Sequence, residues 1–230
     1  MRVTKLNIFI ACLLLVVAAI AGIGRYLSGV RMEQPAYLTL APTLPPMPPG
    51  KIEVVEFFWY GCPHCRKYEP VLEAWARKHA DKVTLRRVPA GLHEKQVPQQ
   101  KMYYAFDKLG RLDEMHRVIF DYVHVGNKAL STDENIGKFA QSHQVSKEQW
   151  QAVYDSASVQ ARVHAATQLQ RDYKAERVPS VVIGGRYVTS PSMVGMTLPY
   201  LGQTDEMRYQ AVEKLMDELL LKVQHERNML

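Results

Sequence analysis

The run KIEVVEFFW, Lys51 to Trp59, stands directly before the stretch YGCPHC, Tyr60 to Cys65. Its β-branched and aromatic residues favour a strand in the buried centre of a sheet. The residues that follow, CRKYEPVLEAWARKHA, predict a helix, and Pro63 suits the first helical turn because an N–H there would have no partner. A buried strand that passes through a tight turn into a helix indicates an α/β domain with two cysteines at the turn.

The two cysteines could be a redox couple, half of a zinc site or a structural staple. The chain has three cysteines in all, no second CxxC, and no HxxxH or HExxH pattern among its eight histidines. A tetrahedral zinc site usually takes four Cys/His ligands in two spaced pairs. A staple between Cys62 and Cys65 would close a loop too short to remove much entropy from the unfolded chain. We therefore expect a redox pair and no metal site.

The start of the chain has the pattern of an export signal. Two basic residues precede an uncharged, mostly apolar run over residues 8–24, in which Ala19 and Ala21 supply an A-x-A cleavage pattern. Residues 1–21 are therefore predicted to be a signal peptide. Cys12 lies within the apolar run and is interpreted as one of its small apolar residues.

An uncleaved signal-anchor is the alternative for the same segment. The apolar run approaches the length of about 20 residues that spans a bilayer, and Arg25 follows it closely. The segment would then hold the protein in the inner membrane through residues 8–24. In both interpretations the rest of the chain enters a compartment that tolerates disulfides.

The charge of the chain does not indicate a nucleic-acid partner. Its 29 basic and 23 acidic residues give a net charge of +6, and they are interspersed without a Lys/Arg block. A mildly basic, solvated surface is the expectation, with no nucleic acid among the partners.

The composition divides the rest of the chain into four segments. Residues 22–50 form a Pro-rich extension that ends in APTLPPMPPG and contains a short edge strand at AYLTL. Residues 51–94 hold the first strand, the CPHC turn, the helix and a second strand at 82–88. Residues 95–163 have a helical pattern, and residues 164–230 return to strand character.

The helical segment predicts five helices, the third and fourth of which begin at capping boxes. These boxes pair Ser131 with Glu134 and Ser146 with Gln149. The helices are predicted at 97–109, 112–125, 132–142, 147–156 and 158–174.

The last segment predicts a hairpin followed by a helix. SVVIGGRYV, Ser180 to Val188, has the pattern of two short strands around Gly184-Gly185. A helix from about Asp205 has one apolar face, formed by Val212, Leu215, Met216, Leu219 and Val223.

This order of elements, together with VVEFFWYGCPHC and RVPSVVIGGRYV, resembles the DsbA family of periplasmic thiol:disulfide oxidoreductases of the thioredoxin superfamily. The resemblance extends from about Ala36 to the C-terminus. It implies an α/β thioredoxin fold with an inserted all-helical domain. Residues 51–94 and 164–230 would form the two parts of the thioredoxin domain, and 95–163 the insertion.

The chemistry of disulfide exchange requires a cysteine that ionises near neutral pH. Cys62 precedes the first turn of the predicted helix, where unpaired N–H groups and the helix dipole favour an anion. His64 lies in that turn, close enough to give the sulfur a hydrogen bond or a positive charge, and Cys65 follows one turn later. The resemblance implies that Cys62 is the exposed nucleophile and Cys65 the more buried resolving cysteine. The Cys62–Cys65 disulfide would itself be the redox centre, without a cofactor.

The resemblance also implies a substrate-binding segment at Val178 and Pro179. In the family a cis-proline faces the CPHC turn, and the residue before it binds the substrate backbone in extended form. Tyr60, with Trp59, is a further candidate for the lining of the substrate groove, although core packing is an equal expectation for Trp59.

Glu56 stands in the otherwise apolar strand, where alternation turns it inward. The family has a buried acidic residue at this place, to which a role in tuning or proton transfer is assigned. A buried carboxylate needs a partner or a raised pKa, and Arg86 or Arg87 on the next strand could be that partner. The alternative is an outward-facing glutamate at a bulge.

The resulting hypothesis is a periplasmic dithiol oxidase, soluble after cleavage of the signal. It would donate its disulfide to exported, unfolded polypeptides, and a DsbB-type quinone-linked membrane partner would reoxidise it. The rivals are an isomerase or reductase of the same fold, and a chaperone-like peptide-binding module with vestigial cysteines.

Overall fold

The computed structural model describes residues 35–41, 50–198 and 203–229. The predicted signal segment, Cys12 and most of the Pro-rich extension lie outside these residues. Within them, no helix is both long enough and apolar enough to cross a bilayer.

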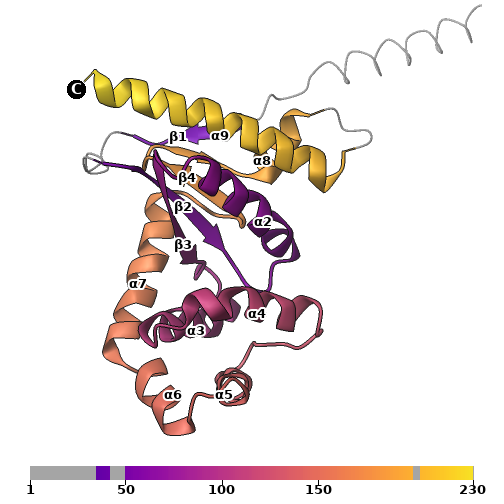
Figure 1. Ribbon diagram of the computed structural model, residues 1–230, viewed down its shortest axis with the longest axis vertical. Helices are drawn as coiled ribbons and strands as arrows, with labels where there is room; N and C mark the ends of the chain where they lie inside the picture. The colour runs from indigo at the N-terminus through magenta and orange to yellow at the C-terminus, as the bar shows by residue number, and fades with distance from the viewer. Residues whose placement is uncertain (1–34, 42–49, 199–202, 230) are drawn as a thin grey trace, which may run out of the picture. The chain divides into compact units, whose positions relative to one another are not determined.

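A mixed five-stranded sheet forms the centre of the domain (Figure 1). The strand order is β1-β5-β4-β2-β3; β2 runs parallel to β3 and antiparallel to β4. The predicted buried strand is β2, next to the β3 edge of the sheet, and the predicted edge strand at AYLTL is β1, which pairs with β5. The strands are β1 (Tyr37–Thr39), β2 (Ile52–Phe58), β3 (Val83–Pro89), β4 (Ser180–Ile183) and β5 (Tyr187–Thr189).

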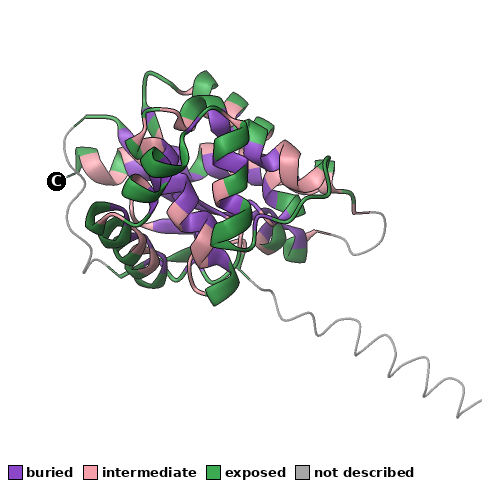
Figure 2. Ribbon diagram, turned by 90° about the horizontal axis from the view of Figure 1, so that it is seen from below, coloured by how far each residue is buried: buried purple, intermediate pink, exposed green. Residues whose placement is uncertain are grey.

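Two helices cover one face of the sheet: α2 (Pro63–Lys78) and α9 (Asp205–Asn228). Their buried residues, such as Leu72 and Met216, pack with Val54 of β2 in one apolar cluster. The next residue of β2, Val55, belongs to a second cluster with the helical segment. Successive residues of a strand point to opposite faces, so β2 is buried on both sides. Figure 2 shows this burial of the strands among helices whose outer turns are exposed.

The helical segment contains the five helices predicted for it, and each begins within one residue of its predicted start. Figure 1 shows α3 to α6 grouped together, with α7 extending from α6 back to the sheet. They are α3 (Val97–Lys108), α4 (Leu112–His124), α5 (Asp133–Ser142), α6 (Lys147–Tyr154) and α7 (Ala157–Asp172), after a short 3-10 turn, η1 (Glu94–Gln96).

One detail of this segment differs from the prediction. The N-cap of α5 is Thr132, whose hydroxyl accepts from the N–H of Asn135, so the predicted cap at Ser131 is wrong by one residue. The predicted cap Ser146 does open α6. The expected boundary between residues 163 and 164 lies within the predicted fifth helix, and the structure forms that helix as α7.

The C-terminal part contains the predicted hairpin and the predicted last helix. Gly184 and Gly185 turn between β4 and β5 with φ of 59° and 66°, a left-handed conformation that suits glycine. A short helix, α8 (Pro191–Thr197), was not predicted. Together the elements form the thioredoxin-type sheet with an inserted helical segment that the sequence indicates.

Candidate active site

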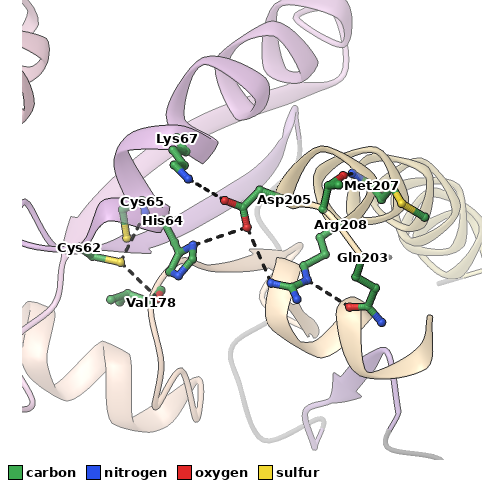
Figure 3. A network of polar contacts seen from close by, with 10 residues as sticks. Cys62, His64, Cys65, Lys67, Val178, Gln203, Asp205, Met207 and Arg208 are labelled. Atoms are coloured by element: carbon green, nitrogen blue, oxygen red, sulfur yellow. Dashed lines mark hydrogen bonds and ion pairs between the residues drawn. The ribbon is translucent and has the colours of Figure 1, made fainter. Parts of the chain in front are cut away.

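Cys62 is the N-cap of α2 (Figure 3). Its backbone is extended, with φ of −95° and ψ of 114°, and its sulfur accepts a hydrogen bond from the N–H of Cys65 at 3.4 Å. Pro63 occupies the first helical position, where a missing N–H costs nothing. The helix therefore begins at the sulfur, and the N–H groups of its first turn point toward it.

These donors make Cys62 an unusually acidic thiol. The hydrogen bond from the Cys65 side chain lowers the pKa of Cys62 most, followed by the backbone N–H groups of Cys65 and His64 and by the charge of His64. Burial acts in the opposite direction, yet the pKa falls to about 6. Cys62 is consequently a thiolate in most molecules at neutral pH.

Cys65 has the opposite environment. Its side chain is fully buried, and this burial raises its pKa well above the usual value. Both cysteines are free thiols in the structure. Cys62 is the more accessible of the two, although only 8 % of its surface is exposed. The two sulfurs therefore differ in both accessibility and acidity, in the sense expected for a nucleophile and its resolving partner.

The Val178–Pro179 peptide bond is cis and directly precedes β4. The Cys62 sulfur lies 3.7 Å from the carbonyl oxygen of Val178, toward which its protonated form donates. Val178 is half-buried beside the sulfur, whereas Pro179 is buried. The fold thus brings the predicted substrate-binding segment to the predicted nucleophile, and its role in substrate binding stays a prediction.

His64 contributes positive charge to the Cys62 thiolate, which is one of the two effects predicted for it. Its side chain is 58 % exposed, and Nδ1 lies 3.9 Å from Oδ1 of Asp205 at the start of α9 (Figure 3). Among the described contacts, no hydrogen bond joins this ring to Cys62. The hydrogen bond that His64 gives to the sulfur comes from its backbone N–H, and the ring acts on the thiolate only through its charge.

Glu56 is fully buried in the middle of β2. It pairs in regular register with Arg87 of β3 and Val181 of β4, so the alternative of an outward-facing residue at a bulge is wrong. Burial raises the pKa of Glu56 well above its usual range, and the charge of Glu69 adds to this, while Arg87 opposes it.

Of the two arginines considered as partners for Glu56, Arg87 is the one that contacts it. The Arg87 Nε atom lies 3.7 Å from Oε2 of Glu56. Arg86 instead pairs with Glu53, at 2.8 Å on the other face of the sheet.

Sequence reasoning missed two members of this buried polar cluster, Glu69 and His116. Arg87 contacts Glu69, whose Oε1 lies 3.3 Å from Nε2 of His116. Burial raises the pKa of Glu69, but hydrogen bonds and charges from His116 and Arg87 outweigh it and hold that pKa below the usual value. Glu69 stands four residues after Cys65, on the same face of α2, and this spacing could have identified it. No comparable signal pointed to His116.

Tyr60 is not part of a substrate groove, and this prediction is corrected. Its side chain is 1 % exposed, so it offers no surface to a polypeptide. Three residues of α4 hold it instead. Nδ1 of His116 shares a 2.8 Å hydrogen bond with the Tyr60 hydroxyl, Nε2 of His124 donates to the Tyr60 carbonyl at 2.8 Å, and the Phe120 ring packs edge-on at 4.9 Å.

A groove of about 1220 Å³ lies between α2, β3 and the helical segment. Glu69, Arg87 and His116 are among its lining residues, so the buried polar cluster extends to its wall. Within residues 35–41, 50–198 and 203–229, no group of three or more His, Cys, Asp or Glu side chains could hold a metal ion.

Comparison with known proteins identifies the family. The profile of the DSBA-like thioredoxin domain matches residues 53–197, more than half of the chain. The thiol:disulfide interchange protein DsbA of Burkholderia cepacia is 38 % identical over 145 residues, which are 63 % of this chain and 68 % of that protein. DsbA of Bordetella pertussis is 38 % identical over 159 residues, 69 % of this chain and 76 % of that one.

Solved structures give the same result. The crystal structure of Pseudomonas aeruginosa DsbA has a TM-score of 0.71 with 29 % identity and covers 84 % of this chain and 94 % of that one. The oxidoreductase NmDsbA1 of Neisseria meningitidis has a TM-score of 0.65 with 26 % identity, over 86 % of this chain and 96 % of that one. The chain belongs to the family of DsbA-like thioredoxin-fold proteins, and it is a thiol:disulfide oxidoreductase.

Proposed function

We propose that the protein oxidises the thiols of exported, unfolded polypeptides by giving them its Cys62–Cys65 disulfide. The observation that carries this proposal is the asymmetry of the pair, an acidic Cys62 at the helix N-cap against a buried Cys65. A stabilised Cys62 thiolate favours the reduced protein, and a pair whose reduced form is favoured is a strong oxidant of other thiols. DsbA itself is the standard example of this relationship.

The proposed reaction has two exchange steps. A substrate thiolate attacks Sγ of Cys62 in the disulfide, the bond to Cys65 breaks, and Cys65 leaves as a thiolate. A second substrate thiolate then attacks the substrate sulfur of the mixed disulfide and releases the Cys62 thiolate. Two electrons pass from the substrate dithiol to the protein, and the substrate gains a disulfide.

Glu56 would supply the proton that the buried Cys65 thiolate needs. A carboxyl group whose pKa is raised by burial retains its proton at pH values where an exposed glutamate has lost it. Once ionised, Glu56 raises the pKa of Cys65 through its charge, which favours the proton on Cys65. Proton transfer to Cys65 would prevent an isolated negative charge from remaining in the core beside β2.

Val178 and Pro179 would bind the substrate chain in extended form next to the attacked sulfur of Cys62. The support is the 3.7 Å approach of Cys62 to the Val178 carbonyl oxygen. In this proposal the cysteine pair needs no further cofactor, because it carries both electrons itself.

The proposed place of action is the periplasm, to which the predicted signal segment would deliver the chain, either free after cleavage or anchored by residues 8–24. A DsbB-type quinone-linked membrane protein would restore the disulfide. An isomerase or reductase of the same fold is the rival with the same chemistry. A peptide-binding module with vestigial cysteines is disfavoured, because binding alone needs no acidic thiol at a helix N-cap.

The reduction potential tests the proposal directly. Equilibration with glutathione should place the Cys62–Cys65 pair near the DsbA value of about −120 mV and far from the thioredoxin value of about −270 mV. In a second experiment, a reduced unfolded protein is offered to the oxidised Cys65→Ser and Cys62→Ser variants, each first activated with glutathione. Only the first should accumulate a mixed disulfide with the polypeptide through Cys62. A potential near that of thioredoxin would instead assign the protein to the reductases.

A further inference from the structure

Asp205 at the start of α9 links that helix to the active-site helix. Its carboxylate lies 2.8 Å from Lys67 Nζ, 3.9 Å from His64 Nδ1 and 3.7 Å from Arg208 Nη1. His64 and Lys67 belong to the first turns of α2, where the helix begins at Cys62. Figure 3 shows the His64 ring between Cys62 and Asp205, with its marked contact toward the carboxylate.

The orientation of the His64 ring depends on this carboxylate. The side chain is 58 % exposed, so packing leaves its rotamers largely free. Asp205 supplies the ion pair that the structure gives the ring. An imidazole whose Nδ1 edge faces a carboxylate on α9 does not present that edge to the sulfur of Cys62.

We propose that Asp205 is a positioning residue that sets how oxidising the cysteine pair is, by holding the His64 ring toward α9 and away from the Cys62 thiolate. The carboxylate and the thiolate compete for one imidazole, and the carboxylate limits the stabilisation that the thiolate receives from it. This inference rests on the proposed role of Cys62 as the acidic nucleophile.

Two cations reduce the direct effect of the Asp205 charge on Cys62. Lys67 and Arg208 form ion pairs with this carboxylate and offset its charge. The hydrogen bond from Lys67 is the main reason why the pKa of Asp205 is below its usual value, so the carboxylate stays ionised where Cys62 titrates. The influence of Asp205 on the sulfur therefore passes mainly through the ring of His64.

The test compares Asp205→Asn with the wild type in two measurements on the full chain. One is the glutathione exchange constant, and the other is the pH titration of the Cys62 thiolate absorbance in the reduced protein. Release of the ring should shift the exchange constant about threefold toward the more oxidising side, about 15 mV for two electrons, and should lower the Cys62 pKa. Asp205→Glu keeps the charge and should restore values close to the wild type.

A double-mutant cycle separates positioning from direct charge. In the His64→Ala background, Asp205→Asn should leave the exchange constant unchanged, because no ring remains to be released. An equal shift in that background would overturn the proposal. So would an unchanged or less oxidising Asp205→Asn single variant.

Asp217→Asn is the matched structural control. Asp217 lies on the same helix and also links it to α2, through a 2.7 Å hydrogen bond from Trp75 Nε1 and an ion pair with Lys78. Asp217→Asn should lower the free energy of unfolding without changing the exchange constant. A shift of the exchange constant equal to that of Asp205→Asn would show that the packing of α9 on α2 is responsible. If the wild-type titration shows no acidic Cys62, both the proposed function and this inference are wrong. If the titration shows an acidic Cys62 and Asp205→Asn changes neither measurement, only this inference is wrong.

Discussion

The sulfur of Cys62 lies 3.7 Å from the carbonyl oxygen of Val178, a residue 116 positions later in the chain. The whole helical segment lies between the two in sequence, yet the sheet returns β4 to β2 and so brings the segment before β4 to the start of α2. In the proposed function, a polypeptide that presents a thiol to Cys62 would therefore pass Val178. This relationship makes the identity of the attacked sulfur the first point to test.

Cys62, rather than Cys65, should react first with an alkylating agent in the reduced protein. Its pKa of about 6 makes half of the molecules thiolates near that pH, whereas burial keeps Cys65 protonated. Limited treatment with iodoacetamide at pH 6, followed by peptide mass mapping, should find the label on Cys62. Preferential labelling of Cys65 would reverse the assignment.

The replacement His64→Ala should make the pair less oxidising. The backbone N–H of residue 64 remains in the variant, so only the contribution of the ring charge is lost. We expect a change of up to about tenfold in the glutathione exchange constant, which corresponds to about 30 mV. A potential that stays within a few millivolts of the wild type would show that the helix N-terminus acts alone.

The reduced protein should be more stable than the oxidised protein at neutral pH. The folded pKa of Cys62, about 6, lies below its unfolded value of about 8.5, so folding of the reduced chain gains free energy wherever the thiolate forms. The gain is complete above pH about 8.5, is about 1.4 kcal/mol at pH 7, and is lost as the pH falls through 6.

Thermal unfolding of both forms from pH 5 to pH 9 measures this dependence. The difference in melting temperature should narrow toward pH 5. A structural disulfide would give the opposite sign, since its reduction usually costs about 2–5 kcal/mol. An oxidised form that is the more stable at pH 7 would contradict the proposed function.

Glu56→Gln should stabilise the protein at pH 8 and leave it unchanged near pH 4. The raised pKa of Glu56 means that the folded state holds its proton more tightly than the unfolded chain, so the wild type loses stability as the pH rises above about 4.3. Glutamine cannot ionise and avoids this loss, so the free energy of unfolding of the variant at pH 8 should exceed that of the wild type by about 1–3 kcal/mol. Urea unfolding at the two pH values measures the change.

The same variant should slow disulfide transfer, because Cys65 loses its proton donor. An unchanged rate of transfer would remove Glu56 from the mechanism.

Tyr60→Phe should lower stability by about 1–3 kcal/mol, because it leaves His116 with an unpaired buried nitrogen. It should not change the apparent affinity for a peptide substrate, since the ring is buried. Val178→Thr serves as the contrasting variant, expected to alter peptide turnover with little effect on unfolding. A substrate defect in Tyr60→Phe at unchanged stability would return this residue to the substrate groove.

The sequence allowed most elements of the fold to be predicted because their signals are local. The apolar period of the helices and the Gly184-Gly185 turn are examples, and α2 and α9 begin within two residues of their predicted starts. Helix α8 was missed because seven residues, with Gly195 among them, are too few to show a period. The cap of α5 was misplaced because Ser131 and Thr132 are adjacent and chemically alike.

The site was predictable where its chemistry is contained in one short stretch, as in CPHC. It was not predictable where partners meet only through the tertiary fold. His116 reaches Tyr60 and Glu69 from α4, and Asp205 reaches His64 from α9. Nothing in the neighbourhood of His64 in sequence indicates that its ring would pair with a distant aspartate.

The contacts between α4 and Tyr60 bear on whether the inserted helical segment can be removed from this protein. His124 and His116 hold the main chain and the hydroxyl of a residue only two positions before Cys62. A shortened protein that lacked residues 95–163 would keep every strand of the sheet and both cysteines. It would nevertheless lose the anchors of the loop that carries them and expose the apolar surfaces of Phe58 and Tyr60. We therefore expect that a minimal oxidoreductase made from this chain would have to rebuild the contacts of the insertion rather than delete them.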